Sequence, residues 1–182
     1  MTWFSVLVVA VGLERLAELV VSQRNAAWST DRGGIESGQR HYPLMVVLHT
    51  GLLIGALAEV WLRHPGFVPA IGVPMLALVL VSQALRWWCI ATLGRQWNTR
   101  VIVVPGLPRV SRGPYRFLSH PNYVAVVVEG FALPLVGSAW ITAVVFTICN
   151  ALLLAVRLRV ESRALTALGG ADVEPSWARV TR

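Results

Sequence analysis

The sequence predicts an all-α integral membrane protein, and three observations support this fold class. Hydrophobic residues make up 55% of the 182 residues and charged residues 14%, against roughly a quarter charged in soluble domains. Five apolar segments approach the length of about 20 residues that spans a bilayer. The loops between these segments collect arginine on one side. We expect a single membrane domain over residues 1–182.

The apolar segments predict five transmembrane helices. The first three run from about Thr2 to Val21, from Pro43 to Leu62 and from Phe67 to Leu93. A shorter fourth segment is bounded by Tyr123 and Pro134, and the fifth runs from about Ala139 to Val156. The last two form a helical hairpin, and the fifth should continue out of the bilayer as a helix.

Arginine placement predicts the orientation. The net charge of +7 comes from arginine, because the chain contains no lysine. Loop 22–42, loop 94–122 and the tail after residue 156 carry most of the arginines, whereas Arg63 is the only one on the opposite side. Positively charged loops stay in the cytoplasm, so we expect the N-terminus outside and the C-terminus inside. Membrane topology explains the basic charge better than nucleic acid, which we do not expect as a partner.

Several charged residues lie inside the predicted helices, where charges are costly and usually functional or paired. Glu14 and Glu18 share one face of the first helix, beside Arg15, and the segment lacks a signal-peptide cleavage pattern, so we expect a retained anchor. For Glu14, Glu18 and Arg86 we favour ion pairs that fix helix packing over a lipid-headgroup pocket. For Glu129 both interpretations stay open.

Cysteine and histidine patterns exclude other kinds of site. Cys89 and Cys149 lie in apolar runs without paired spacing, so we interpret them as small core residues rather than a disulfide or metal pair. His120 has no His, Cys or carboxylate at ligand spacing, and we expect no metal site. The glycines do not form a dinucleotide-binding motif after a strand.

The segment Gly113–Tyr123 is a polar, rigid insert between apolar runs, and we expect the chemistry here. Two prolines restrict its backbone, and Gly113 would permit a close approach of backbone to ligand. Its tyrosines, histidine and asparagine supply hydrogen-bonding groups. Beyond the fifth segment, Arg157 and Glu161 share a helical face, where they could form a salt bridge or hold opposite ends of a charged ligand.

This run, Gly-Pro-Tyr-Arg-Phe-Leu-Ser-His-Pro-Asn-Tyr, resembles the signature of the isoprenylcysteine carboxyl methyltransferase family. Arg157, Glu161 and Leu165 match an arginine, a glutamate and a leucine of that family's tail helix, and the resemblance covers about residues 93–165. Features nearer the N-terminus, such as Asn25, resemble a bacterial branch associated with lipids made by type III polyketide synthases.

The resemblance implies a multi-pass cell-membrane enzyme that transfers a methyl group from S-adenosylmethionine to a lipophilic substrate on the cytoplasmic side. Arg157, which matches a substrate arginine, and His120 are the implied catalytic residues. The implied cofactor-binding residues are Pro108, Arg109, Val110, Tyr115, His120, Pro121, Asn122, Tyr123 and Glu161. Two departures stand out: Ser119 replaces an arginine, for which Arg112 or Arg116 could substitute, and Ser162 replaces a glutamate.

The leading expectation for the acceptor is an alkylpyrone or alkylresorcinol lipid, methylated on oxygen, with a functional link to a type III polyketide synthase. Isoprenylcysteine-type carboxyl methylation and phospholipid N-methylation are alternatives, and a small transporter or membrane adaptor is the non-enzyme alternative. An already ionised acceptor would need only positioning by Arg157, whereas a phenol would need a base such as His120 or Glu129.

Overall fold

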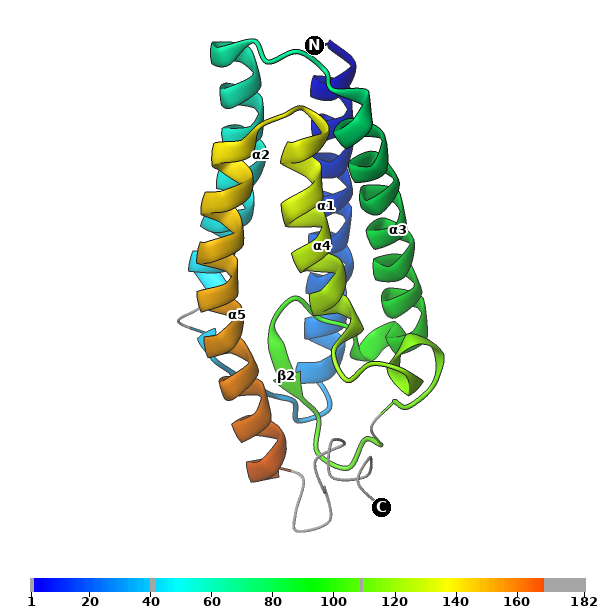
Figure 1. Cartoon of the computed structure of the whole chain (residues 1–182). Coiled ribbons are helices and arrows are strands. Elements are labelled where there is room, and N and C mark those ends of the chain that lie inside the picture. Colours follow the sequence, from blue (N-terminus) through cyan, green and yellow to red (C-terminus); the bar gives the residue numbers. More distant parts are fainter. Residues whose placement is uncertain (1, 40–41, 109, 169–182) are drawn as a thin grey trace, which may run out of the picture.

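The computed structural model describes residues 2–39, 42–108 and 110–168, with side chains as far as Glu161. Its five long helices run side by side and alternate in direction (Figure 1). The N-terminus and the α2–α3 and α4–α5 connections lie at one end of the bundle, and the long α3–α4 segment lies at the other (Figure 1). The helices are α1 (Thr2–Thr30), α2 (Tyr42–Arg63), α3 (Pro69–Leu93), α4 (Pro121–Val136) and α5 (Trp140–Leu168).

Three of these helices, α2, α3 and α5, are long and apolar enough to cross a membrane. The helix α4 has 16 residues and is shorter than a full span. The helix α1 is long, but charged residues interrupt its apolar character halfway along. The helical bundle expected from the sequence is therefore present. Among the described residues, three helices meet the length and composition of a membrane span, and the expected count of five crossings stays a prediction.

One stripe of α1 changes its chemistry along the helix. At the N-terminal end the buried residues are apolar, in the middle the buried residue is the charged Glu18, and at the far end they are small and polar. The buried residues of this stripe, three, four or seven positions apart, are Phe4, Val8, Val11, Glu18, Ser22, Asn25 and Ser29. This spacing keeps them on one helical face. Along this face α1 contacts the apolar core first, then charged residues of α3, and finally the segment that follows α3.

The far end of α1 corrects the sequence interpretation, which began a loop at Ser22. The helix continues to Thr30 because its polar residues have partners there. Asn25 Nδ2 donates to the Trp97 carbonyl oxygen at 2.7 Å, and Ser22 Oγ accepts from the Thr99 amide at 3.0 Å. These contacts attach the segment after α3 to α1.

A two-stranded antiparallel sheet was not expected from the sequence. Strand β1 (Ile35–Ser37) pairs with β2 (Val101–Val103), with Glu36 opposite Ile102. The run of branched aliphatic residues in β2 has high strand propensity, but the three residues of β1 show no comparable pattern. The sheet closes the bundle end that carries the α3–α4 segment.

The apolar core lies at the opposite end of the bundle, where α1 packs against α2, α3 and α4. The carboxylate of Glu59 on α2 accepts hydrogen bonds from the Ile141 and Thr142 amides, at 3.1 and 2.8 Å. A negative charge at a helix N-terminus is stabilising, so this contact fixes the start of α5 beside α2. The expectation that both cysteines are core residues holds for Cys89 but is wrong for Cys149, which lies on the exposed outer face of α5.

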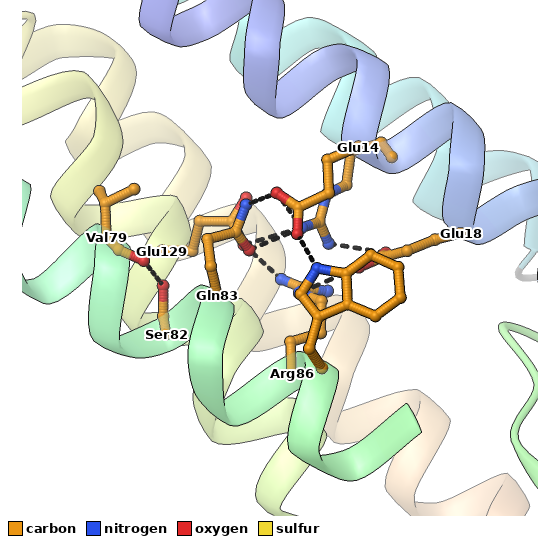
Figure 2. A network of polar contacts seen from close by, with 9 residues as sticks. Glu14, Glu18, Val79, Ser82, Gln83, Arg86 and Glu129 are labelled. Carbon is orange, nitrogen blue, oxygen red and sulfur yellow. Dashed lines mark hydrogen bonds and ion pairs between the residues drawn. The ribbon is translucent and has the colours of Figure 1, made fainter. Parts of the chain in front are cut away.

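A network of charged residues joins α1, α3 and α4 halfway along the bundle (Figure 2). Arg15 lies 2.8 Å from Glu18 and 3.6 Å from Glu129, and Arg86 forms a buried ion pair with Glu129. The carboxylate of Glu14 accepts from Gln83 and Trp87 at the edge of the network. The expected ion pairing of Glu14, Glu18 and Arg86 is thus present, and Glu129 belongs to the same network.

Candidate functional site

A cavity of about 580 Å³ lies at the end of the bundle that carries the sheet. Its walls are the α3–α4 segment including β2, the start of α4 and the last described side chains of α5. Small-molecule sites commonly enclose roughly 300–1,000 Å³. The lining includes eight residues expected at the site: Pro108, Val110, Tyr115, His120, Asn122, Tyr123, Arg157 and Glu161.

Tyr123 connects the two charged residues of α5. Its hydroxyl accepts a hydrogen bond from Arg157 Nε at 2.9 Å and donates one to Glu161 Oε2. No ion pair within 4.0 Å joins Arg157 directly to Glu161 among the described contacts, so the salt bridge considered from their spacing does not form. The phenol instead holds the cation and the anion apart along one wall of the cavity.

His120 lies beside this pair. Its ring stacks on that of Tyr123, with centroids 5.3 Å apart and an interplanar angle of 14°. His120 Nδ1 lies 3.6 Å from Glu161 Oε1. The start of α4 and the end of α5 are therefore linked through both oxygens of one carboxylate. This arrangement gives the cavity a wall with an imidazole, a phenol and a carboxylate in contact.

Arg157 also contacts two elements outside the helical hairpin. Its Nη2 donates to the Thr99 carbonyl oxygen at 2.6 Å, and its Nη1 faces Met45 Sδ at 2.8 Å. A thioether is a weak acceptor for a guanidinium donor. One donor of Arg157 is therefore poorly satisfied within the protein and could bind an oxygen of a ligand.

The insert expected to carry the chemistry begins with a short 3₁₀ helix, Gly113–Arg116. Gly113 has φ of +59°, and a Cβ atom there would lie 2.5 Å from Thr92 Oγ1. Glycine thus permits a close approach of this turn to α3. Tyr115 follows in the same turn, and burial, followed by its contact with Cys89, raises the pKa of its hydroxyl above the ordinary value. Tyr115 therefore stays a neutral hydrogen-bonding group near neutral pH.

Comparison with known proteins identifies the family. A model of the isoprenylcysteine carboxyl methyltransferase (ICMT) family matches residues 75–167, half of the chain. The chain belongs to the ICMT family. Its members are membrane methyltransferases, which supports the interpretation of this chain as an enzyme. Apart from Ser29, every residue that lines the cavity lies within the matched range.

Two bacterial relatives extend the similarity over most of the chain. A protein described as "Uncharacterized protein YpbQ" from Bacillus subtilis is 37% identical, covering 89% of this chain and 96% of the relative. A protein from Haemophilus influenzae, described as "Uncharacterized protein", is 26% identical, covering 85% of this chain and 90% of the relative. No solved structure gives a significant match.

Most of residues 96–104 line the cavity, although the sequence predicted only a loop there. Trp97 is 2% exposed and, with Asn98, forms a corner of the cavity wall. One signal in the sequence could have indicated that Trp97 and Asn98 matter. Ser22 and Asn25 are polar but continue the spacing of the buried stripe of α1. Both bind this corner.

Three buried polar atoms of lining residues have no hydrogen-bond partner among the described residues. They are Trp97 Nε1, Asn98 Nδ2 and Asn122 Oδ1. The other end of the Asn98 amide is engaged, because Ser22 Oγ donates to its Oδ1 at 3.4 Å. Buried polar atoms without partners are unusual and costly, so these three are candidates for contacts with a ligand.

The remaining residues expected at the site either do not line the cavity or fall outside the described residues. Arg109 falls outside the described residues, and nothing is described of the Ser162 side chain. Pro121 is buried in the first turn of α4 and is not among the lining residues. Arg112 and Arg116, considered as substitutes for the arginine replaced at Ser119, are both exposed and do not line the cavity, whereas Ser119 does.

Proposed function

We propose that this member of the ICMT family transfers a methyl group from S-adenosylmethionine to a lipophilic acceptor at the membrane. The observation that carries the proposal is the contact of Arg157 and Glu161 with Tyr123 along the wall of a cavity at one end of an apolar bundle. Such a cavity can bind a water-soluble ligand at the end of the bundle, while the apolar helices beside it contact lipid.

The lining residues fit S-adenosylmethionine. Glu161 is the one carboxylate among the described lining residues and suits a positively charged part of the cofactor. The unpartnered atoms of Trp97, Asn98 and Asn122 are uncharged and suit a neutral part. When bound, the cofactor supplies a methyl group on a sulfonium, which a nucleophile can attack directly. The protein then needs to hold the reactants aligned and exclude water.

Arg157 is the residue we propose for positioning the acceptor. Its Nε and Nη2 are occupied by Tyr123 and Thr99, which fix the guanidinium plane, while Nη1 faces the weak acceptor Met45 Sδ. An anionic oxygen would be a much better partner for that donor. We therefore propose that an acceptor oxygen takes the place of the sulfur and is held there by its charge.

This arrangement favours an acceptor that is ionised before it reacts. The proposed acceptor is an alkylpyrone or alkylresorcinol made by a type III polyketide synthase, with its chain among the apolar helices. An enolic pyrone loses its proton near neutral pH, so Arg157 alone would suffice. A resorcinol would need a base, and His120, beside Glu161 in the same wall, is the described residue placed for that role. Glu129 is already engaged by Arg86 in the buried network.

We further propose that all five helices cross the membrane, with the N-terminus outside and the cavity facing the cytoplasm. The charged stripe of α1 would be tolerated in the bilayer because Arg15 and Arg86 pair its carboxylates inside the bundle. The alternating helix directions put the arginine-rich segments at the cavity end (Figure 1). Such an orientation follows the rule that positive loops remain cytoplasmic.

Calorimetry of the detergent-solubilised chain with S-adenosylhomocysteine tests the enzyme proposal. We expect binding by the wild type, strongly weakened binding by Glu161→Ala, and unchanged binding by the control Glu36→Gln. Glu36 is a suitable control because it lies in β1 and does not line the large cavity. Absence of binding by the wild type, or equal binding by Glu161→Ala, would count against the proposal and favour a transporter or adaptor.

A further inference from the structure

Phe117 and Leu118 are apolar residues that lie outside the cavity lining. Phe117 is 70% exposed and Leu118 is 43% exposed, although Tyr115 and Ser119 on either side of them line the cavity. The amides of both apolar residues donate to the Pro114 carbonyl oxygen, at 3.2 and 3.1 Å. One hydrogen-bonded turn therefore presents two adjacent apolar side chains on the outside of the protein.

A cationic side chain accompanies this apolar pair. The Arg116 guanidinium lies over the Phe117 ring, with Cζ 5.0 Å from the ring centroid. Arg100 lies over Tyr42 in the same way but also pairs with Glu36, at 3.4 Å. Arg116 is exposed and has no such ion pair among the described residues. A guanidinium beside apolar side chains suits a partner that offers both phosphate and hydrocarbon.

The turn lies where α3 reaches its cavity end. A Cβ atom at Gly113 would lie 2.5 Å from Thr92 Oγ1, so the turn packs against the last residues of a helix long enough to span a membrane. Trp88, one helical turn before Thr92, is 51% exposed, and tryptophan is enriched at membrane interfaces. One turn advances only about 5.4 Å. The turn also lies at the edge of the bundle, beside the end of α3 (Figure 1).

The chemistry of this surface selects one occupant. A protein partner would need a contact of roughly 1,200–2,000 Å², far more than one turn provides. A free phosphate ion would bind the guanidinium but leave the Phe117 ring in water. An anionic phospholipid contacts both groups, with its phosphate at Arg116 and its glycerol and upper acyl chain at the apolar side chains. The cytoplasmic leaflet is rich in such lipids.

We propose that Arg116, Phe117 and Leu118 form a contact site for the headgroup of an anionic phospholipid in the cytoplasmic leaflet. The inference rests on the membrane orientation proposed above and not on methyl transfer. Ser119 and His120 follow this turn directly and line the cavity. Lipid bound at the turn would therefore hold that wall of the cavity at the membrane surface.

Spin labelling in nanodiscs tests the depth of this surface. A background of Cys89→Ala and Cys149→Ser carries one label, introduced at Leu118→Cys, Val81→Cys or Asp31→Cys. Val81, 64% exposed on α3, is the bilayer-facing control, and Asp31, exposed beyond the end of α1, is the water-facing control. We expect a water-soluble nickel chelate to collide much less with the Leu118 label than with the Asp31 label.

Native mass spectrometry of the full chain in detergent tests the lipid preference. Titration with phosphatidylglycerol and with phosphatidylcholine gives an affinity ratio, which should favour phosphatidylglycerol for the wild type. Arg116→Gln should lower the ratio about fivefold, the effect of one basic residue at an anionic surface. Arg112→Gln is the matched control, an exposed arginine of the same segment without a ring beneath it among the described residues, and should keep the ratio. Phe117→Ser should weaken both lipids equally.

The outcomes separate this site from the other proposals. A Leu118 label as accessible to nickel as the Asp31 label, with the Val81 label protected, would show that the turn faces water. An accessible Val81 label would overturn the membrane orientation, and the lipid site with it. An unchanged lipid ratio in folded Arg116→Gln, or an equal loss in Arg112→Gln, would contradict headgroup binding at this turn. Loss of the wild-type preference in inorganic phosphate would assign the site to a free anion instead. The methyltransferase proposal is tested separately, by cofactor binding.

Discussion

Replacing Arg86 by glutamine would remove one cation from the buried network between α1, α3 and α4. With every side chain in its ordinary charge state, three carboxylates face two guanidinium groups there, which leaves one excess negative charge (Figure 2). Arg86→Gln raises this excess to two charges, whereas Glu129→Gln removes it. The two substitutions break the same Arg86–Glu129 ion pair but change the network charge in opposite directions.

The structure therefore predicts unequal costs. Arg86 is 5% exposed and Glu129 4% exposed, so neither charge left behind can be solvated without rearrangement. Breaking a buried pair and leaving an uncompensated charge costs about 3–5 kcal/mol, which we expect for Arg86→Gln. Glu129→Gln keeps the side-chain shape and leaves Arg86 near Glu18, at 3.6 Å. We expect it to cost about 1–2 kcal/mol, as for weakened hydrogen bonds.

Equilibrium unfolding by SDS titration in mixed micelles, followed by far-ultraviolet circular dichroism, measures both costs. The double variant Arg86→Gln/Glu129→Gln should be more stable than Arg86→Gln alone, because removing the second partner also removes one unpaired carboxylate. A larger cost for Glu129→Gln than for Arg86→Gln, or simple addition of the two costs in the double variant, would refute the charge balance described here.

Other substitutions test packing and the site. Gly130→Ala would place a Cβ atom 1.9 Å from Phe146 Cε1 and should destabilise by about 1–3 kcal/mol, whereas Gly51→Ala meets nothing within 4 Å and should stabilise by up to about 1 kcal/mol. Equal effects in the same unfolding assay would contradict this packing. Tyr123→Phe removes the hydroxyl that binds two charged side chains and should weaken S-adenosylhomocysteine binding by about tenfold or more in calorimetry. Unchanged affinity would show that the hydroxyl does not organise the site. Arg157→Ala should reduce kcat/KM for the lipid acceptor more than it reduces cofactor affinity, and full activity on every acceptor tested would exclude its proposed role.

The sequence predicts the helices well, because apolar length is a local property. The continuation of the fifth helix beyond Val156 was also expected, and α5 extends to Leu168. The extension of α1 to Thr30 does not, since Ser22 and Asn25 read as loop residues until their partners around residues 94–99 are known. Pairing between β1 and β2 likewise joins segments far apart in the chain, and no local signal specifies it.

For the site, the sequence indicated eight residues that line one cavity, but not the contacts between them. The spacing of Arg157 and Glu161 correctly placed both side chains on one face of α5, yet the contact of each with Tyr123 depends on how α4 lies against α5. The Trp97–Asn98 corner was missed because a buried indole in a loop has no periodic pattern. Its importance is visible only from its unpartnered atoms and its attachment to α1.

The proposal that this protein transfers a methyl group from S-adenosylmethionine to a lipid is tested most directly by following a labelled methyl group. The purified chain in nanodiscs would be incubated with methyl-labelled S-adenosylmethionine and a bacterial lipid extract that contains alkylpyrones and alkylresorcinols. We predict label in the organic phase with the wild type, none with Glu161→Ala and little with Arg157→Ala, and recovery of a methylated polyketide lipid by mass spectrometry. Absence of label from every lipid fraction, with a wild-type protein that binds S-adenosylhomocysteine, would contradict methyl transfer to a lipid acceptor.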